Sequence, residues 1–292
     1  MKQLCVLGSL HLDVIVNANN LPQIDETVVG SEVNYVFGGK GGNQALAAEG
    51  HGANVYFIGR VGNDSFGESL LTTLRDSSID ISQVKQEAGA SGMSVAIINQ
   101  QGDYGAVIVS ESNLRIETTD IKIKKNTGIL LLQNEVPEEI NLWASAKAIK
   151  EGSQVWLNAA PARKISKELL NNLDVVIINR PEAHYYGDLF VANDSNHILK
   201  IFTLGSEGIE VHFPNNKREY HPAYLIDVQS THGAGDMFVG ALAANYLKNN
   251  NFSDALQYAQ AAAAIKVSRN TTERTSVYEE DVAEFLQNYQ IL

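Results

Sequence analysis

The chain has 292 residues, with a formal net charge of −12 at pH 7 and an isoelectric point near 5.0. This acidic balance disfavours binding to nucleic acid, because contacts with a phosphate backbone require a basic surface. Hydrophobic residues make up 44% of the chain, and its one cysteine, Cys5, excludes an internal disulfide. We therefore expect a globular protein of the cytoplasm, without a membrane partner.

Short apolar runs alternate with helical periods along the chain, which favours an α/β fold with helices on both faces of a sheet. The runs are continuously apolar, as is typical of parallel strands buried on both sides. We expect such strands at Gln3–Leu7, Asn54–Ile58, Gly128–Leu132, Gln154–Leu157, Val175–Ile178 and Ile198–Thr203.

Helix signals lie between these runs. Ser65 with Glu68 has the pattern of a capping box at the start of a helix. Its apolar face would carry Phe66, Leu70, Leu71 and Leu74. Asp254–Val267 predicts a helix of small residues that allows close packing, although helix-forming composition alone gives the same run of alanines. Ser276 with Glu279 is a second capping-box pattern, opening a final helix.

Two segments break the α/β rhythm. Val28–Phe37 and Met93–Val109 have the composition of strands, and the second folds back near 101–103. We expect them to form a small sheet that stands off the main one.

Two glycine-rich stretches run directly into apolar helical patterns. They read FGGKGGNQALAA at 37–48 and STHGAGDMFVGA at 230–241. A helix start offers unpaired N–H groups and a dipole that favours an anion, and glycine lets a ligand approach the backbone closely. Gly41 follows Lys40 where a P-loop needs Ser or Thr, and neither stretch completes a dinucleotide-binding fingerprint.

Asp236 lies inside the second stretch. A carboxylate at a site suited to anions suggests a base that accepts a proton from a hydroxyl group. The N–H groups of Gly233, Ala234 and Gly235 would cradle a phosphoryl group beside it. The plain alternative is a helix-start residue in an ordinary glycine-rich loop.

Shorter motifs follow in a fixed order along the chain. They are a G-x-D-x-x-G turn at 62–67, E-x-P at 135–137, NAAPAR at 158–163, N-x-x-E at 179–182 and TLGxxG at 203–208. With GGKGGNQA and GAGD, they resemble the ribokinase-like (PfkB) carbohydrate-kinase family, and the lysine in the first stretch resembles its ribokinase branch. The resemblance implies a single three-layer domain over residues 1–292. Its mainly parallel central sheet would carry a small β-sheet lid, contributed by about 11–37 and 91–113, which is often the contact of a homodimer.

The resemblance also implies an activity and its residues. The protein would be an ATP-dependent kinase that uses Mg²⁺ and transfers the γ-phosphoryl group to a hydroxymethyl of a pentose or related sugar. Asp236 would be the base and Gly233, Ala234 and Gly235 the anion hole. The sugar-binding residues would be His11, Asp13, Gly39, Lys40, Asn43 and Glu135. The nucleotide would contact Asn179, Thr203, Gly205 and Gly208, and Glu182 would hold Mg²⁺ through water. Taken alone, residues such as Asp13 and Glu135 are more often solvated loop carboxylates than sugar ligands, and Asn179 is typical of a turn.

The sequence departs from the family pattern in several places. His11 replaces an asparagine that touches the sugar. Ser230 and His232 replace Asp and Thr before the anion hole, and the pair 271–272 replaces Gly-Ala. The last two changes fall on a monovalent-cation site, so dependence on such a cation is doubtful. Gln260 replaces a histidine near the adenine, and the stretch 187–203 is shorter than usual by about one short helix.

Two other functions remain open at this stage. His11 and the lid leave room for a kinase of another small polyol, such as a nucleoside, deoxysugar or inositol. The altered cation site leaves room for a non-catalytic protein that binds sugar or nucleotide.

Overall fold

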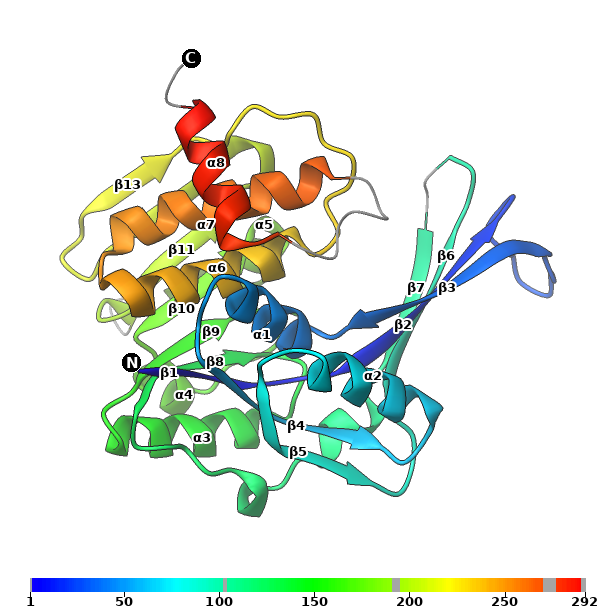
Figure 1. Ribbon diagram of the computed structural model, residues 1–292, viewed down its shortest axis with the longest axis horizontal. Helices are drawn as coiled ribbons and strands as arrows, with labels where there is room; N and C mark the ends of the chain where they lie inside the picture. Colours follow the sequence, from blue (N-terminus) through cyan, green and yellow to red (C-terminus); the bar gives the residue numbers. More distant parts are fainter. Residues whose placement is uncertain (1, 102–103, 191–194, 270–276, 290–292) are drawn as a thin grey trace.

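A nine-stranded sheet runs through the molecule (Figure 1). In their order across the sheet the strands are β13 (Arg218–His221), β12 (Ile209–His212), β11 (Leu199–Thr203), β10 (Val175–Asn179), β9 (Gln154–Asn158), β8 (Thr127–Gln133), β1 (Gln3–Leu7), β4 (Val55–Gly62) and β5 (Asp80–Glu87). Neighbouring strands are parallel, except that β12 pairs antiparallel with β11 and with β13. The computed structural model describes all residues except 1, 102–103, 191–194, 270–276 and 290–292.

All six expected strands are present, and β4 extends to Gly62, beyond the expected end at Ile58. The sequence did not reveal β5, β12 and β13. β5 and β13 are the two edge strands, and β12 lies next to β13. Polar residues separate the few apolar ones in all three, as in DISQVKQE of β5. They lack the continuous apolar run that marks a central parallel strand.

Helices cover both faces of the sheet, so the fold has three layers (Figure 1). One face carries α1 (Lys40–Gly50), α2 (Ser65–Arg75), α6 (Ala234–Asn249), α7 (Phe252–Ser268) and α8 (Glu279–Tyr289). The other carries α3 (Glu138–Lys150), α4 (Lys167–Asn171) and α5 (Arg180–Tyr186). Among the helices that the structure describes, none has both the length and the hydropathy to cross a bilayer.

Strand β1 is buried on both sides. Leu4 and Val6 join the core under α1 and α6, whereas Cys5 and Leu7 join the core under α3. Burial raises the pKa of the Cys5 thiol to about 12, so this cysteine is an inert core residue.

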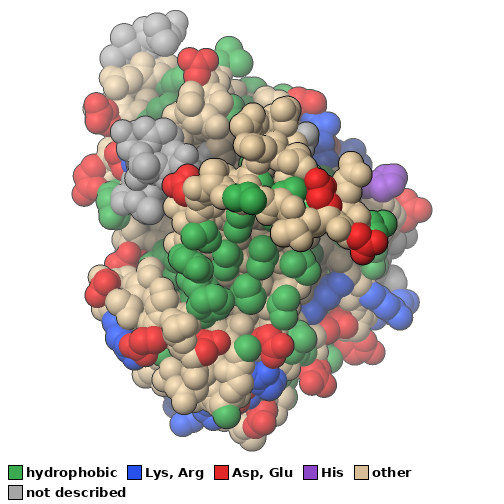
Figure 2. Space-filling view, turned by 90° about the vertical axis from the view of Figure 1, so that its right-hand side faces the viewer, with side chains coloured by type: hydrophobic (Ala, Val, Ile, Leu, Met, Phe, Trp, Pro, Cys, Tyr) green, Lys and Arg blue, Asp and Glu red, His purple; other side chains and the backbone are tan. Residues whose placement is uncertain are grey.

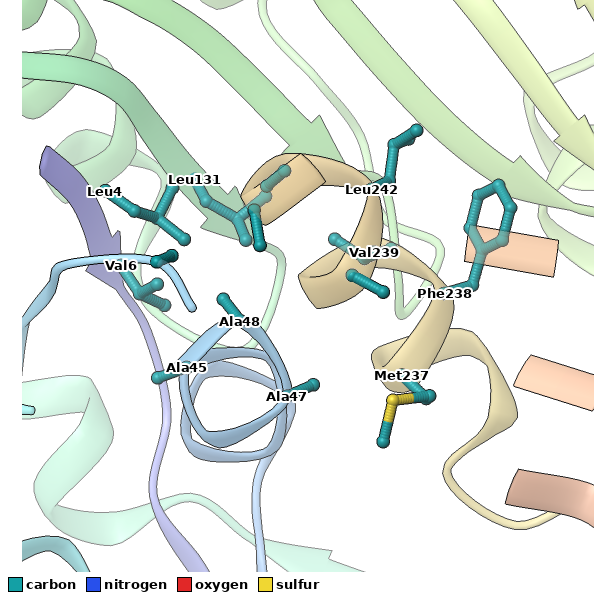
Figure 3. Packing of buried hydrophobic residues seen from close by; sticks show 14 of the residues in the cluster. Leu4, Val6, Ala45, Ala47, Ala48, Leu131, Met237, Phe238, Val239 and Leu242 are labelled. Carbon is teal, nitrogen blue, oxygen red and sulfur yellow. The ribbon is translucent and has the colours of Figure 1, made fainter. Parts of the chain in front are cut away.

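Close packing of α1 against α6 brings the two glycine-rich stretches together. Figure 3 shows Ala47 of α1 pointing toward α6, where Met237 and Val239 lie. A Cβ atom on Gly240 of α6 would lie 2.6 Å from the Cβ atom of Ala47. Only glycine fits there, so the helices approach closely and their first turns converge on one site.

A second, four-stranded sheet stands off the main one (Figure 1). In order, its strands are β3 (Gly30–Gly38), β2 (His11–Ala18), β6 (Gly92–Ile98) and β7 (Tyr104–Val109). The pair β2–β6 is parallel and the other two pairs are antiparallel. The segments 28–37 and 93–109 therefore form strands as expected, and the turn between β6 and β7 includes residues 102–103, outside the described part of the chain.

The capping box expected for Ser65 and Glu68 is wrong. Asp64 is the N-cap of α2, and its Oδ1 accepts a hydrogen bond from the N–H of Gly67 at 2.7 Å. Glu68 instead pairs with Arg75 on the helix surface. Aspartate and serine are equally good N-cap residues. Because Asp64 and Ser65 are adjacent, the sequence alone does not show which of them precedes the first turn of the helix. The second capping box includes Ser276, which lies outside the described residues, as does the pair 271–272 of the expected cation site.

Candidate active site

The ends of three parallel strands and the starts of three helices surround one pocket. It has a volume of about 190 Å³ and lies at the carboxyl ends of β9, β10 and β11. Its lining includes Lys40 from α1, Asn179 and Glu182 at α5, Thr203 from β11, and Gly233 and Asp236 at α6. In open parallel sheets, ligands bind at such an edge.

The first turn of α6 faces this pocket. Gly233 is its N-cap and adopts a left-handed backbone with φ of 73°, which glycine allows without strain. The space beside Gly235 is open, because a Cβ atom there would meet no other atom within 4 Å. The N–H of Ala234 makes a long bond of 3.3 Å to the carbonyl of Thr231. The helix start is therefore open to a bound anion.

Asp236 is held in the third position of α6 by two side chains of α1. Gln44 Nε2 donates to its Oδ1 at 2.9 Å, and Asn43 Nδ2 lies 3.5 Å from its Oδ2. Burial raises the pKa of Asp236, while the charge of Lys40 and the hydrogen bond from Gln44 act to lower it. The carboxylate thus has a raised basicity in a fixed orientation.

Lys40 stands among three carboxylates. Burial favours its neutral amine, but Asp236, Glu135 and Glu182 outweigh that effect and raise the pKa of Lys40. Its ammonium group is therefore charged at neutral pH. Its main-chain N–H donates to Glu135 Oε2 at 2.9 Å, which fixes the start of α1 relative to the end of β8.

Glu135 and His11 lie together on the side toward the small sheet. Glu135 Oε2 also accepts from the hydroxyl of Ser9 and lies 3.9 Å from His11 Nδ1. The His11 residue is 2% exposed, and its Nε2 has no hydrogen-bond partner within the described residues. Burial lowers the pKa of His11, although Glu135 and Asp13 act to raise it. His11 is thus a buried, neutral imidazole with an unsatisfied nitrogen, which is an uncommon arrangement.

Asp13 lies two residues along β2, on the same face as His11. It accepts a hydrogen bond from the hydroxyl of Ser94, and burial raises the pKa of its carboxyl group. A Cβ atom on Gly38 would lie 2.2 Å from Asp13 Oδ2. Gly39 has φ of 86°, and a Cβ atom there would lie 2.8 Å from the main-chain nitrogen of His11. Gly38 therefore leaves room for the Asp13 carboxylate, and Gly39 lets the chain pass close to the main chain at the start of β2.

Asn179 and Glu182 form a capping box at the start of α5. Asn179 Oδ1 accepts from the N–H of Glu182, and Glu182 Oε2 accepts from the N–H of Asn179, both at 2.9 Å. Burial raises the pKa of Glu182, although Asn179 and Lys40 act to lower it. Asn179 therefore ends β10 and caps α5, where the alternative interpretation expected a turn. Both residues also line the pocket.

Thr203 lines the pocket, whereas Gly205 begins the following turn, η5 (Gly205–Glu207), and Gly208 is the C-cap of that turn. A Cβ atom on Gly208 would lie 2.1 Å from the carbonyl oxygen of His221, so this glycine is needed for packing. Gly205 borders open space. Gln260 donates to the carbonyl oxygens of His221 and Pro222 and so anchors the end of β13, against which Gly208 packs.

Comparison with known proteins agrees with this geometry. The chain matches the family model of pfkB family carbohydrate kinases over residues 1–277. The chain belongs to the pfkB family of carbohydrate kinases. It is 34% identical to the ribokinase of Lactococcus lactis over 280 residues, 92% of each chain. It is 29% identical to the ribokinase of Haemophilus influenzae, over 98% of this chain and 99% of that one.

Solved ribokinases share the fold. The structure of Arabidopsis thaliana ribokinase complexed with ribose and ATP superposes with a TM-score of 0.90 at 26% identity, covering 98% of this chain and 99% of that one. Ribokinase from Thermotoga maritima gives a TM-score of 0.88 at 25% identity, covering 99% and 100%. The expected fold, family and activity are confirmed: the protein is an ATP-dependent sugar kinase.

The site of this kinase contains residues whose place in the sequence indicated no role. Gln44 accepts from Gln133 Nε2 at 2.9 Å and donates to Asp236, so two buried amides link the end of β8 to the expected base. Asn158 and Ala160 line the pocket from the NAAPAR segment. The glycine-rich motif contains Gln44, but only the fold shows which side chain it orients.

The donors near the pocket suit a magnesium ion held mostly by water and phosphate. In the described part of the chain, no three His, Cys, Asp or Glu side chains cluster as a metal cage. Glu182 uses Oε2 in the capping box, which leaves Oε1 for a water molecule. A single carboxylate with water and phosphate oxygens is a common environment for Mg²⁺.

Proposed function

We propose that this kinase transfers the γ-phosphoryl group of ATP to a hydroxymethyl group of a pentose, with Asp236 as the base. The observation that carries this proposal is the position of Asp236. Its carboxylate lies at the open start of α6, where it lines the pocket at the strand ends and accepts a hydrogen bond from Gln44. A hydroxyl group placed there can lose its proton to Asp236 while its oxygen attacks a phosphorus atom held by the helix start.

The sugar would lie under the small sheet. Asp13 and Asn43 offer hydrogen-bond partners to adjacent hydroxyl groups. Glu135 contacts Ser9, Lys40 and His11 through Oε2, so its Oε1 can accept a hydrogen bond from the sugar. The close turn at Gly39 exposes backbone to the same space. Fixed polar partners of this kind orient a sugar and reject analogues that leave them unpaired.

The transferred phosphoryl group would bind where positive charge converges. The N–H groups of Gly233, Ala234 and Gly235 would stabilise its oxygens, and the Lys40 ammonium would add a full charge. Mg²⁺ bound to ATP would neutralise phosphate oxygens, with Glu182 holding it through water. Asn179, Thr203 and Gly205 would contact the nucleotide at the strand ends.

We propose ribose or a closely related sugar as the acceptor. The relatives are ribokinases, which supports ribose. The buried Nε2 of His11 favours a relative of ribose whose hydroxyl pattern satisfies an imidazole in place of an amide. The deciding experiment is an ADP-release assay over pentoses, hexoses, nucleosides and inositol. Activity confined to non-pentose acceptors would overturn the pentose assignment.

We also propose that the small sheet closes over the sugar and pairs with a second copy of the chain in a homodimer. Large apolar side chains of β3 and β7 are exposed, including Val33, Tyr35, Val107 and Ile108. Figure 2, which faces the right-hand side of Figure 1, shows hydrophobic side chains gathered in its middle. Sedimentation of the native protein and of Val107→Lys tests this pairing.

We place the reaction in the cytoplasm, where ATP is supplied.

A further inference from the structure

One strand of the small sheet brings a hydroxyl group to the expected sugar site. Strand β6 reads GMSVAII, in which Ser94 is the one polar side chain among seven residues. β6 pairs in parallel with β2, and Ser94 lies opposite Asp13 in that pairing. The hydroxyl group of Ser94 donates a hydrogen bond to Asp13 Oδ1. An otherwise apolar strand therefore meets the expected sugar-binding carboxylate with a single donor.

The small sheet also fixes the second oxygen of this carboxylate. A Cβ atom on Gly38 of β3 would lie 2.2 Å from Asp13 Oδ2, so glycine is needed there. Asp13 is thus held between a donor from β6 and the main chain of β3. The residue stays partly exposed, so its carboxylate can still accept hydrogen bonds from a ligand.

Several titratable groups act on Asp13. Burial has the largest effect and raises the pKa of its carboxyl group. The hydrogen bond from Ser94 opposes burial more strongly than either neighbouring histidine does. His11 of β2 and His232 of the loop before α6 act to lower the pKa, and Glu135 after β8 acts to raise it. Since a hydroxyl donor favours the ionised form of a carboxylate, Ser94 works against the effect of burial.

We propose that Ser94 is a positioning residue for the sugar, whose hydroxyl group orients Asp13 and keeps it an ionised acceptor for sugar hydroxyl groups. An ionised carboxylate only accepts hydrogen bonds, whereas protonation turns one of its oxygens into a donor. Ser94 would then extend sugar binding to lower pH than burial alone allows. This inference rests on the sugar-binding role of Asp13 proposed above and adds a residue of the small sheet to it.

Calorimetry of ribose binding without nucleotide tests this role. It is made from pH 5 to pH 8 in the Asp236→Asn protein, in which that carboxylate cannot titrate. Adding Ser94→Ala should weaken binding roughly tenfold at pH 5, the value of one hydrogen bond to a charged group. The loss should be smaller at pH 8, where Asp13 is ionised in both proteins. Ser94→Thr keeps the hydroxyl group and should bind as the parent protein does.

Ser78→Ala is a matched control. The hydroxyl group of Ser78 donates to Glu49 Oε1 at 2.7 Å on the surface, at the last turn of α1. This variant removes the same kind of hydrogen bond away from the small sheet, so it should leave ribose binding unchanged at every pH. In turnover, Ser94→Ala should raise KM for the sugar at acidic pH and leave kcat near its native value.

Titration of Asp13 itself tests the proposal without any sugar. NMR of carbon-13 in the side-chain carboxyl groups of aspartate follows it, and Asp13→Asn identifies its signal. The pKa of Asp13 should be higher in Ser94→Ala than in the native protein and unchanged in Ser78→Ala. An unchanged pKa in Ser94→Ala, or a loss of ribose affinity of the same size at every pH, would overturn the proposal. If the native protein phosphorylates no sugar, the proposed function fails, and this titration still decides the role of Ser94.

Discussion

Gln44 donates a hydrogen bond of 2.9 Å to Asp236, across 192 positions of sequence and from one helix start to another. The amide of Gln44 cannot turn freely, because its oxygen accepts from Gln133 at 2.9 Å. Gln44 and Gln133 are both completely buried. The expected base is therefore oriented by a chain of two amides that begins at the end of a central strand.

Replacing Asp236 by asparagine is expected to abolish turnover while preserving the site. Asn keeps the shape and fits the first turn of a helix, but it cannot accept the proton of the sugar hydroxyl. We expect kcat to fall by roughly 10²–10⁴-fold, with sugar binding retained in calorimetry. Asp254→Asn is the control, since Asp254 is the third residue of α7, as Asp236 is of α6. Near-native turnover of Asp236→Asn would exclude the assignment.

The same substitution should also stabilise the fold at neutral and alkaline pH. The pKa of Asp236 is raised in the folded protein above its ordinary value of 3.8, chiefly by burial. The native state then binds more protons than the unfolded state, so this carboxylate reduces stability as pH rises from about 4 through the raised pKa. Thermal unfolding of both proteins from pH 4 to pH 8 should show a Tm difference in favour of Asp236→Asn that grows with pH. An unchanged or reversed difference would contradict the raised pKa.

Gln44 should control the pH at which the base becomes active. Its hydrogen bond favours the ionised carboxylate and lowers the pKa of Asp236. Gln44→Met removes the donor with little change of volume, so the pKa rises further and the acidic limb of the kcat profile moves to higher pH. The loss at the acidic end should be roughly tenfold, the value of one hydrogen bond to a charged group.

A matched control exists at the other edge of the sheet. Gln83 of β5 makes two hydrogen bonds to the main chain of Lys122, far from the pocket. Gln83→Met should leave the pH profile in place. If Gln44→Met lowers kcat equally at every pH, then Gln44 supports the fold without tuning the base.

The sequence predicted the central strands and the two helix starts because each depends on neighbouring residues. Continuous apolar runs mark β1 and β8, and glycines beside Asp236 mark an anion-binding helix start. The edge strand β5 was not predicted because its exposed positions interrupt the apolar pattern. Asp64 replaced Ser65 as the cap of α2 because adjacent residues compete for that position.

Partners that are distant in sequence could not be predicted. Gln133 reaches Gln44 across 89 positions, and nothing local marks either amide as part of the site. The burial of His11 depends equally on the fold, because Gly92 of β6 leaves room for its ring: a Cβ atom there would lie 2.5 Å from His11 Cδ2.

His11 is expected to set the sugar preference. An asparagine amide presents a donor and an acceptor together, whereas each nitrogen of a neutral imidazole offers only one of these. The unsatisfied Nε2 of His11 costs roughly 1–3 kcal/mol until a substrate hydroxyl pairs with it. His11→Asn should therefore raise kcat/KM for ribose relative to the sugar that the native enzyme prefers, by roughly tenfold or more.

The ratio of kcat/KM values for two sugars is the decisive readout, because a general loss of stability or activity cancels in it. His212→Asn is the control, since His212 lies in β12 and pairs with Glu210 near the outer edge of the main sheet. It should leave the ratio unchanged. The ratio should also be constant for the native enzyme above pH 7, because burial lowers the pKa of His11 below its ordinary value of 6.5 and so favours the neutral ring. A native enzyme that already prefers ribose over every other sugar, with a ratio that His11→Asn does not alter, would show that His11 has no part in choosing the substrate.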